Sequence, residues 1–213
     1  MKKILSKTRY YKSFLTLLLF KLIKSFINHI KYKAMLIIKR ILIALILIVS
    51  IVLITAYFMP REYAVTKEIM INRRADSVFN YIRYFKNQNE FSVWSKIDPK
   101  MKLTYKGTDG TVGAISAWES EVKDVGIGEQ EVTKIIEGKR IDFALRFKKP
   151  MEDTAVAFMS TETVSNDETK VKWGISGVIP YPINIMLPMM KMDQMIGNDL
   201  QKGLVNLKAK MEN

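Results

Sequence analysis

The chain has 213 residues, no cysteine, one histidine and a formal net charge of +13. This length allows one domain of ordinary size and an appendage. Eleven of the 34 basic residues lie before Ile41, where no acidic residue occurs, which leaves 23 basic residues against 21 acidic residues in the rest of the chain. Because the excess charge lies outside the candidate folded domain, we predict no nucleic-acid partner.

An uncharged stretch of 19 residues, Ile41 to Met59, follows the basic segment. At about 1.5 Å per residue, a helix of this length covers the roughly 30 Å of bilayer hydrocarbon. We therefore predict a transmembrane anchor over residues 35–60, ended by Pro60. Basic residues precede the stretch, whereas Arg61 behind it is balanced by Glu62, so the positive-inside rule predicts a cytoplasmic N-terminus and an extracytoplasmic C-terminal domain.

A cleaved signal peptide is the alternative to an anchor. The apolar stretch is longer than the usual 7 to 15 residues of a signal peptide, and no A-x-A-like site follows it. Residues 1–34 leave a second alternative open. On a helix, Lys21, Lys24 and Lys31 would share one face and Leu15, Leu18, Leu19, Leu22, Ile23, Phe26 and Ile30 the other, as in a cytoplasmic helix lying in an anionic leaflet. However, Met35 opens a compact anchor by itself, so these residues could equally be an over-extended gene start.

Residues 61–213 have the pattern of an α+β domain. Tyr63 to Asn72 is rich in β-branched and aromatic residues and predicts a first strand. Val78, Ile82 and Phe85 recur at helical spacing and predict a helix over 76–85, followed by a loop over 87–99. Five or six strands are expected next, separated by turn signals at 107–110, 121–128, 137–138, 149–153 and 166–167.

Short connections favour an antiparallel meander, because parallel strands need crossovers of a dozen or more residues. Apolar residues alternate with polar or charged ones in two segments, at Ile141, Phe143, Leu145 and Phe147 and at Val171 and Trp173. This alternation predicts a sheet with one buried face. A methionine-rich helix is expected from about Met189 to Met211, with an inner side formed by Met192, Ile196, Leu200, Gly203, Leu204 and Leu207.

In this order, the motifs of residues 61–213 resemble the SRPBCC superfamily, also called START-like or Bet v 1-like, and within it the membrane-anchored bacterial branch labelled polyketide cyclase. The similar segments include Val78-Phe79-Asn80-Tyr81-Ile82, Trp94-Ser95, Tyr105-x-Gly107, Ser116-x-Trp118-Glu119 and Met192-Asp193-x-Met195-Ile196-Gly197. The resemblance implies a helix-grip fold, in which a curved antiparallel sheet wraps around a long C-terminal helix and leaves a cavity for a hydrophobic ligand.

An apolar cavity of this kind would be lined by aromatic and flexible side chains. The candidate lining residues are Trp94, Tyr105, Trp118, Phe143, Phe147, Trp173, Met189, Met192 and Ile196. The candidate polar groups near the cavity are Glu119, Glu129, Arg146 and Asp193. Each of these residues also has a plainer interpretation, since methionines fill cores and charged side chains pair at surfaces.

Catalytic chemistry has little support in the sequence. The only histidine, His29, lies before the anchor, so the domain lacks an imidazole, and without cysteine it offers no Zn site or Cys or Ser nucleophile of the usual kinds. We expect no cofactor and no metal. The favoured hypothesis is a membrane-anchored binding module for a hydrophobic small molecule or lipid. The alternatives are a cyclase or aromatase-like enzyme and a module that docks another envelope protein.

Overall fold

The computed structural model describes the backbone from Lys2 to Asn213, and side chains from Lys31 onward and at a few earlier positions. The chain divides into two compact units at Thr55 and Ala56. Helix α1 (Lys2–Phe58) makes up the first unit and ends in the second. The predicted amphipathic face of residues 1–34 depends on side chains, such as Leu15 and Ile23, that lie outside the described residues.

One helical segment in the described part of the chain is long and apolar enough to cross a membrane, Lys31–Phe58 in α1. Its side chains are almost all exposed, and they include Ile41, Leu45 and Ile48. The segment contains the predicted anchor stretch. Its length and composition agree with a membrane span, and a signal sequence near an N-terminus also satisfies these two criteria.

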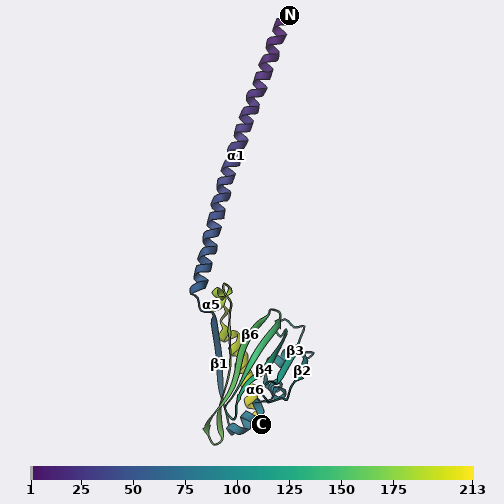
Figure 1. Ribbon diagram of the computed structural model, residues 1–213, viewed down its shortest axis with the longest axis vertical. Helices are drawn as coiled ribbons and strands as arrows, with labels where there is room; N and C mark the ends of the chain where they lie inside the picture. Colours follow the sequence, from purple (N-terminus) through teal and green to yellow (C-terminus); the bar gives the residue numbers. More distant parts are fainter. Residues whose placement is uncertain (1) are drawn as a thin grey trace. The chain divides into compact units, whose positions relative to one another are not determined.

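The second unit is built on a seven-stranded antiparallel sheet with strand order β1-β7-β6-β5-β4-β3-β2 (Figure 1). The strands β2 to β7 form a meander, and β1 closes it by pairing with β7. This confirms the predicted α+β architecture and the antiparallel connections. The strands are β1 (Glu62–Ile71), β2 (Lys102–Lys106), β3 (Ile115–Glu119), β4 (Ile127–Ile136), β5 (Arg140–Lys149), β6 (Asp153–Ser165) and β7 (Glu168–Val178).

Burial along the strands follows the predicted alternation. In β5, Ile141, Phe143 and Leu145 are buried while their neighbours are more exposed, and in β7 Val171 and Trp173 are buried. Successive side chains of a strand point to opposite faces, so each strand contributes every second residue to the core face. Register shifts in β4 and β6 interrupt the ladder, and such irregularities bend a sheet.

Three short helices connect β1 to β2: α2 (Ala75–Ile82), α3 (Phe85–Phe91) and α4 (Trp94–Ile97). The predicted helix over 76–85 is found as α2, which ends at Ile82. The predicted loop over 87–99 is wrong, because α3 and α4 occupy most of it. Phe85, Gln88 and Phe91 are buried at helical spacing, but seven residues are too few for a clear periodic pattern.

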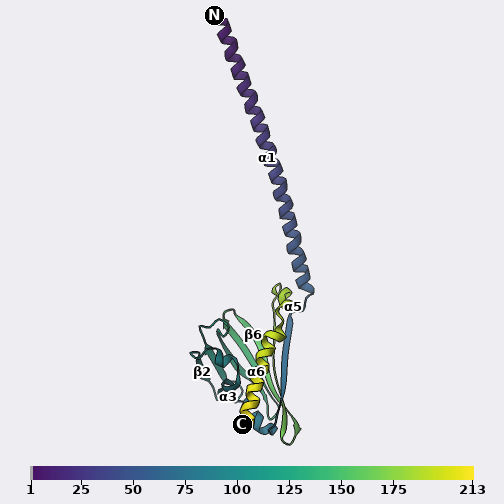
Figure 2. The ribbon, with the colours of Figure 1, turned by 180° about the vertical axis from the view of Figure 1, so that it is seen from behind.

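The C-terminal region contains η1 (Ile183–Met186), α5 (Leu187–Met190) and α6 (Met192–Glu212). The long helix begins at Met192 instead of Met189, because Lys191 adopts a left-handed conformation with φ of 47° and separates α5 from α6. Figure 2 shows α6 lying across one face of the sheet, close to β1. The predicted inner side is largely confirmed, since Leu200, Gly203, Leu204 and Leu207 are buried on α6.

A buried asparagine links η1 to the last turn of α1, which belongs to the second unit. The amide Nδ2 of Asn184 donates hydrogen bonds to the carbonyl oxygens of Ala56, at 2.7 Å, and Met59, at 3.1 Å. The last carbonyls of a helix have no partner within the helix, and side-chain donors satisfy them. Asn184 thus serves as a C-terminal cap for α1.

The hydrophobic core of the second unit lies entirely between Val65 and Leu207. Large side chains from the sheet, from α2 and α3 and from α6 meet in it, including Phe79, Phe143 and Leu204. The second unit therefore has a hydrophobic core of its own.

Glu212 ties the end of α6 to the end of β1, and this contact predicts a pH dependence. Its carboxylate accepts hydrogen bonds from the Asn72 backbone N–H, at 2.6 Å, and from Lys208 Nζ, at 2.8 Å. The hydrogen bond from the Asn72 backbone lowers the pKa of Glu212 most, and the bond from Lys208 lowers it further, so the pKa lies below its usual value. The ionised Glu212 therefore stabilises the folded state fully above about pH 4.3, the ordinary pKa of a glutamate side chain. This stabilisation is lost as the pH falls through the lowered pKa that Glu212 has in the folded state.

We expect Glu212→Gln to lower the midpoint of urea unfolding at neutral pH, and the difference from the wild type to shrink as the solution is acidified. Unfolding followed by circular dichroism at several pH values measures this difference. A difference that stays constant down to low pH would contradict the assignment. Glu62→Gln is the control, because Glu62 is exposed and has no ion pair among the described residues.

Candidate functional site

A cavity of about 250 Å³ lies between the sheet and the helices of the second unit. The leucines in the second half of α6 fill one part of the space over the sheet, whereas Ile196 is the only lining residue from α6. The lining residues come from β1 to β7, from α3, α4 and α6, and from the connection between α3 and α4 and the loops before β2 and β4. They are Tyr63, Gln88, Asn89, Ser92, Trp94, Ser95, Met101, Leu103, Ser116, Trp118, Asp124, Val125, Gln130, Leu145, Phe147, Ala155, Ala157, Trp173, Ile175 and Ile196.

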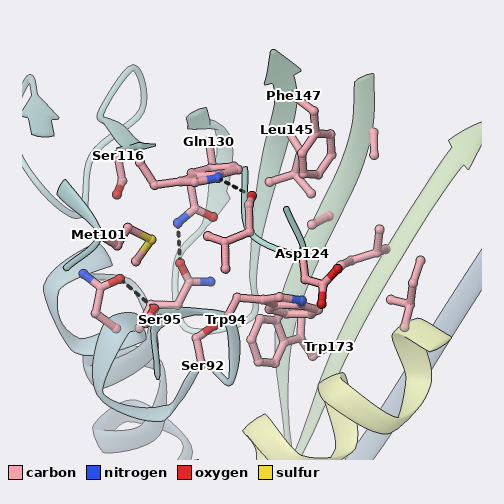
Figure 3. Close-up of a pocket in the computed structure, with 18 of the residues that line it drawn as sticks. Ser92, Trp94, Ser95, Met101, Ser116, Asp124, Gln130, Leu145, Phe147 and Trp173 are labelled. Carbon is pink, nitrogen blue, oxygen red and sulfur yellow. Dashed lines mark hydrogen bonds between the residues drawn. The ribbon is translucent and has the colours of Figure 1, made fainter. Parts of the chain in front are cut away.

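All three tryptophans of the chain line this cavity. Trp94 and Trp173 meet edge to face with ring centroids 5.8 Å apart, and Trp118 meets Phe147 in the same way at 5.9 Å. Such geometries stabilise aromatic pairs beyond the burial of their surface. The aromatic rings therefore form a rigid apolar wall, part of which is seen with Phe147, Trp94 and Trp173 in Figure 3.

Two glycines make room for the tryptophans. A Cβ atom at Gly203 of α6 would lie 2.6 Å from Cζ3 of Trp173, and one at Gly128 of β4 would lie 2.5 Å from Cζ2 of Trp118. Any side chain at these positions would displace an indole ring. The Trp118 ring is also fixed by a hydrogen bond of 3.2 Å from its Nε1 to the carbonyl oxygen of Val125. The packing of the backbone thus determines the shape of the cavity wall.

A second part of the lining is polar and uncharged. Gln130 Nε2 of β4 donates a hydrogen bond of 2.7 Å to Gln88 Oε1 of α3, and Ser116 of β3 lies directly opposite Gln130 in the strand register. On its other side Gln130 lies opposite Leu145 of β5, so the polar row of Ser116 and Gln130 adjoins the apolar part of the lining. Ser95 Oγ donates a hydrogen bond of 3.1 Å to Asn89 Oδ1. The cavity therefore has an apolar wall and a polar wall.

The lining holds two ionisable groups, Asp124 and Tyr63, and no Lys, Arg or His. Asp124 is exposed and lies in the loop between β3 and β4, so its carboxylate is at the rim. Burial and the nearby charge of Asp153 raise the pKa of Tyr63, so its phenol stays neutral at physiological pH. The cavity consequently has a neutral interior and one negative group at its edge.

The structure brings together five of the nine cavity residues predicted from the sequence: Trp94, Trp118, Phe147, Trp173 and Ile196. The other four lie elsewhere. Phe143 packs in the core against Phe85, with ring centroids 5.8 Å apart. Met192 packs against the core at the start of α6, and Met189 is 78% exposed in α5, because the helix break at Lys191 separates the methionine-rich stretch from the cavity.

Tyr105 is the fourth of these residues. Its hydroxyl accepts a hydrogen bond from Asn89 Nδ2 and so supports a lining residue from outside the cavity. Burial raises the pKa of Tyr105, although the bond from Asn89 acts in the opposite direction. Tyr105 therefore remains a neutral side chain that positions Asn89.

The predicted polar candidates do not line the cavity. Arg146 Nη1 pairs with Glu129 Oε1 at 3.1 Å, and Arg146 also pairs with Glu131, on the face of the sheet opposite Leu145. Asp193 pairs with Lys67 Nζ at 2.9 Å and is largely exposed. Glu119 is exposed at the end of β3. Charged side chains remain where water can solvate them, which places these groups outside an apolar interior.

The sequence analysis missed Gln88, Gln130 and Ser116. Gln88 and Ser116 are buried polar residues, with exposed fractions of 6% and 2%. Strand alternation predicts that Gln130 and Ser116 face the core. A polar residue at a core-facing strand position could therefore have indicated a polar part of the cavity. Among the described residues, no group of three or more His, Cys, Asp or Glu side chains is placed to hold a metal ion.

No protein-family model matches the sequence, and comparison with curated proteins finds no match. Solved structures are similar in fold. A protein of Nitrosospira multiformis is 18% identical with a TM-score of 0.51, over 70% of this chain and 96% of that one. The Mll3558 protein of Rhizobium loti is 16% identical with a TM-score of 0.51, over 70% and 96% of the two chains. Truncated norcoclaurine synthase from Thalictrum flavum is 12% identical with a TM-score of 0.50, over 70% and 92%.

The second unit is a helix-grip domain with the Bet v 1-like fold, in which an antiparallel sheet holds a long C-terminal helix. At these identities the likeness establishes the fold alone. Proteins that share a fold differ widely in function, so the function has to be argued from the cavity.

Proposed function

We propose that the chain is a membrane-anchored binding module that takes up a hydrophobic small molecule in the cavity of its second unit. The observation that carries this proposal is a cavity of about 250 Å³ lined by all three tryptophans. Interiors of proteins are normally packed without voids of this size, and concave apolar sites with a few polar groups are typical ligand sites.

The volume limits the ligand. A cavity of about 150 Å³ lined by apolar side chains holds benzene, so this one has room for roughly ten non-hydrogen atoms. A lipid with two acyl chains is much larger and would have to extend through the rim. The volume therefore favours a small aromatic or alicyclic molecule over a whole lipid.

The anchor belongs to the same proposal. Residues 1–34 would lie in the cytoplasm, residues 35–60 would span the membrane, and the domain of residues 61–213 would lie on the outer side, in line with the apolar segment Lys31–Phe58 and the basic residues before it. The mass of the protein purified from membranes tests this point. Retention of residues 35–60 supports an anchor, and their removal identifies a signal peptide.

An enzyme of the polyketide cyclase or aromatase type has less support. Such an enzyme needs an acid or base against an enolisable substrate, and Asp124 and Tyr63 are the only ionisable groups in the lining. The protein-docking alternative likewise has no specific observation in its favour. Binding is thus the function that the site supports best.

Intrinsic fluorescence gives a direct test, since every tryptophan of the chain faces the cavity. We expect toluene, added to the full chain in phospholipid nanodiscs, to shift the tryptophan emission to shorter wavelength in a saturable way, because it displaces water from around the indole rings. Native mass spectrometry of the same sample should detect a ligand retained from the cells. An emission spectrum that toluene leaves unchanged, together with a bare protein mass, would contradict the proposal.

A further inference from the structure

We infer that the cavity selects ligands with a neutral hydrogen-bonding group, such as an alcohol, and discriminates against carboxylates of the same skeleton. This inference rests on the proposed binding function and names the chemical class of its ligand. It follows from the polar wall formed by Gln88, Gln130 and Ser116 and from the charge of the lining.

The polar wall is held in place by regular structure. Ser116 and Gln130 are cross-strand partners in β3 and β4, so their side chains lie side by side on the same face of the sheet. Gln88, on α3, approaches from the helical side and accepts the hydrogen bond from Gln130 at 2.7 Å. Because two strands and a helix fix these groups, the wall presents a defined pattern of donors and acceptors to the cavity (Figure 3).

This pattern is incomplete within the protein. Gln88 uses its carbonyl oxygen, Gln130 uses its amide nitrogen, and the Ser116 hydroxyl has no hydrogen-bond partner among the described residues. Gln88 and Ser116 are nonetheless more than nine-tenths buried. Among the described residues, Asn184 Oδ1 is the one fully buried side-chain oxygen or nitrogen without a partner, so the free atoms of Gln88, Gln130 and Ser116 remain accessible from the cavity. A group that can both donate and accept, as an alcohol does, matches the unused amide N–H, amide oxygen and hydroxyl.

The charge of the lining opposes a carboxylate. No Lys, Arg or His lines the cavity, and Asp124 adds a negative charge at the rim. An ionised carboxylate would lose its hydration without gaining a counter-ion, which is costly in an apolar interior. A fatty acid or aromatic acid would therefore have to bind in its protonated form, whereas an alcohol enters without a change of protonation.

The apolar wall determines the other end of the ligand. Across the sheet from Gln130 of β4, the cavity is lined by Trp173 and Ile175 of β7, with β5 and β6 lying between. An aromatic or alicyclic group would therefore pack against these two residues while the polar group faces Gln130. Phenylbutanol has this form and about the size that the cavity admits. Phenylbutyrate has the same skeleton with a carboxylate in place of the alcohol.

Isothermal titration of the full chain in phospholipid nanodiscs, with empty nanodiscs as the blank, compares the two compounds at neutral pH. We expect phenylbutanol to bind at least about tenfold more tightly than phenylbutyrate, because the carboxylate loses hydration that no cation in the lining replaces. Equal or tighter binding of phenylbutyrate would overturn the inference. Toluene, which has no polar group, tests binding alone, so failure of all three compounds would contradict the proposed function together with the inference.

Three variants make the test specific. Ser116→Ala and Gln130→Met should each weaken phenylbutanol binding about tenfold more than they change toluene binding, whereas a loss of fold, seen by circular dichroism, would abolish both. Asp124→Lys supplies a cation at the exposed rim and should bring the affinity for phenylbutyrate close to that for phenylbutanol. If Ser116→Ala and Gln130→Met keep the circular dichroism spectrum of the wild type and change toluene and phenylbutanol binding equally, the polar group of the ligand does not contact this wall and the inference is overturned.

Discussion

Replacing Ala157 with phenylalanine is expected to abolish binding of toluene and of larger ligands to the cavity. Ala157 lies on the inner face of β6, is 6% exposed and lines the cavity. A cavity of about 150 Å³ is filled by one benzene ring, so an added phenyl ring would occupy most of the 250 Å³ present here. Because the ring enters existing space, the variant should retain its fold at a smaller cost than the usual overpacking penalty of about 1–3 kcal/mol.

Val156→Phe is the matched control for this variant. Val156 is the preceding residue of the same strand, its side chain points to the opposite face, and it is 59% exposed. We expect this control to bind toluene as the wild type does, measured by the shift of the tryptophan emission. If Ala157→Phe folds as the wild type does and still binds toluene with unchanged affinity, the ligand site is not this cavity.

Replacing Phe91 with alanine is expected to lower the free energy of unfolding of the second unit by about 3–5 kcal/mol, the range for aromatic residues removed from a core. Phe91 is fully buried at the end of α3 and meets Trp173 edge to face, with ring centroids 5.6 Å apart. Its carbonyl oxygen also accepts a hydrogen bond of 3.0 Å from Asn206 of α6. The ring therefore joins α3 to the sheet beside the cavity and supports the indole that forms its wall.

Urea unfolding of the full chain in nanodiscs, followed by tryptophan emission, measures this loss. Tyr84→Ala is the comparison, since Tyr84 is an aromatic residue near the same helix but is 40% exposed. We expect it to cost about 1 kcal/mol, the centre of the distribution for single substitutions. Similar losses for both variants would show that the contact of Phe91 with Trp173 does not stabilise the domain in the way described.

The order and type of most elements could be predicted from the sequence because they depend on local patterns. Alternation at Ile141, Phe143 and Leu145 and turn signals between the strands predict an antiparallel meander, and the spacing of Leu200, Leu204 and Leu207 predicts the helix that covers it. The apolar stretch from Ile41 to Met59 likewise predicts a candidate span by composition alone. These features need only the periodicity of a single element.

The cavity was predicted less completely, because it depends on contacts between elements. Trp94 of α4, Trp118 of β3 and Trp173 of β7 come together only when the sheet is closed by α6, and Gly203 and Gly128 determine how closely the backbone approaches their rings. The left-handed Lys191 displaces Met189 from the position that a continuous helix would give it. A single-sequence pattern contains no information about such a break.

Composition and periodicity by themselves determined that this chain has an apolar segment able to span a membrane and an α+β domain with one buried sheet face. Only the tertiary structure decided which side chains surround the cavity. The pairing of Gln130 with Gln88, across 42 residues, and the position of Ser116 beside Gln130 arise from strand register and helix packing. Those contacts join residues that are far apart in the chain. Local sequence preferences do not determine which of these residues meet, because strand register and helix packing do.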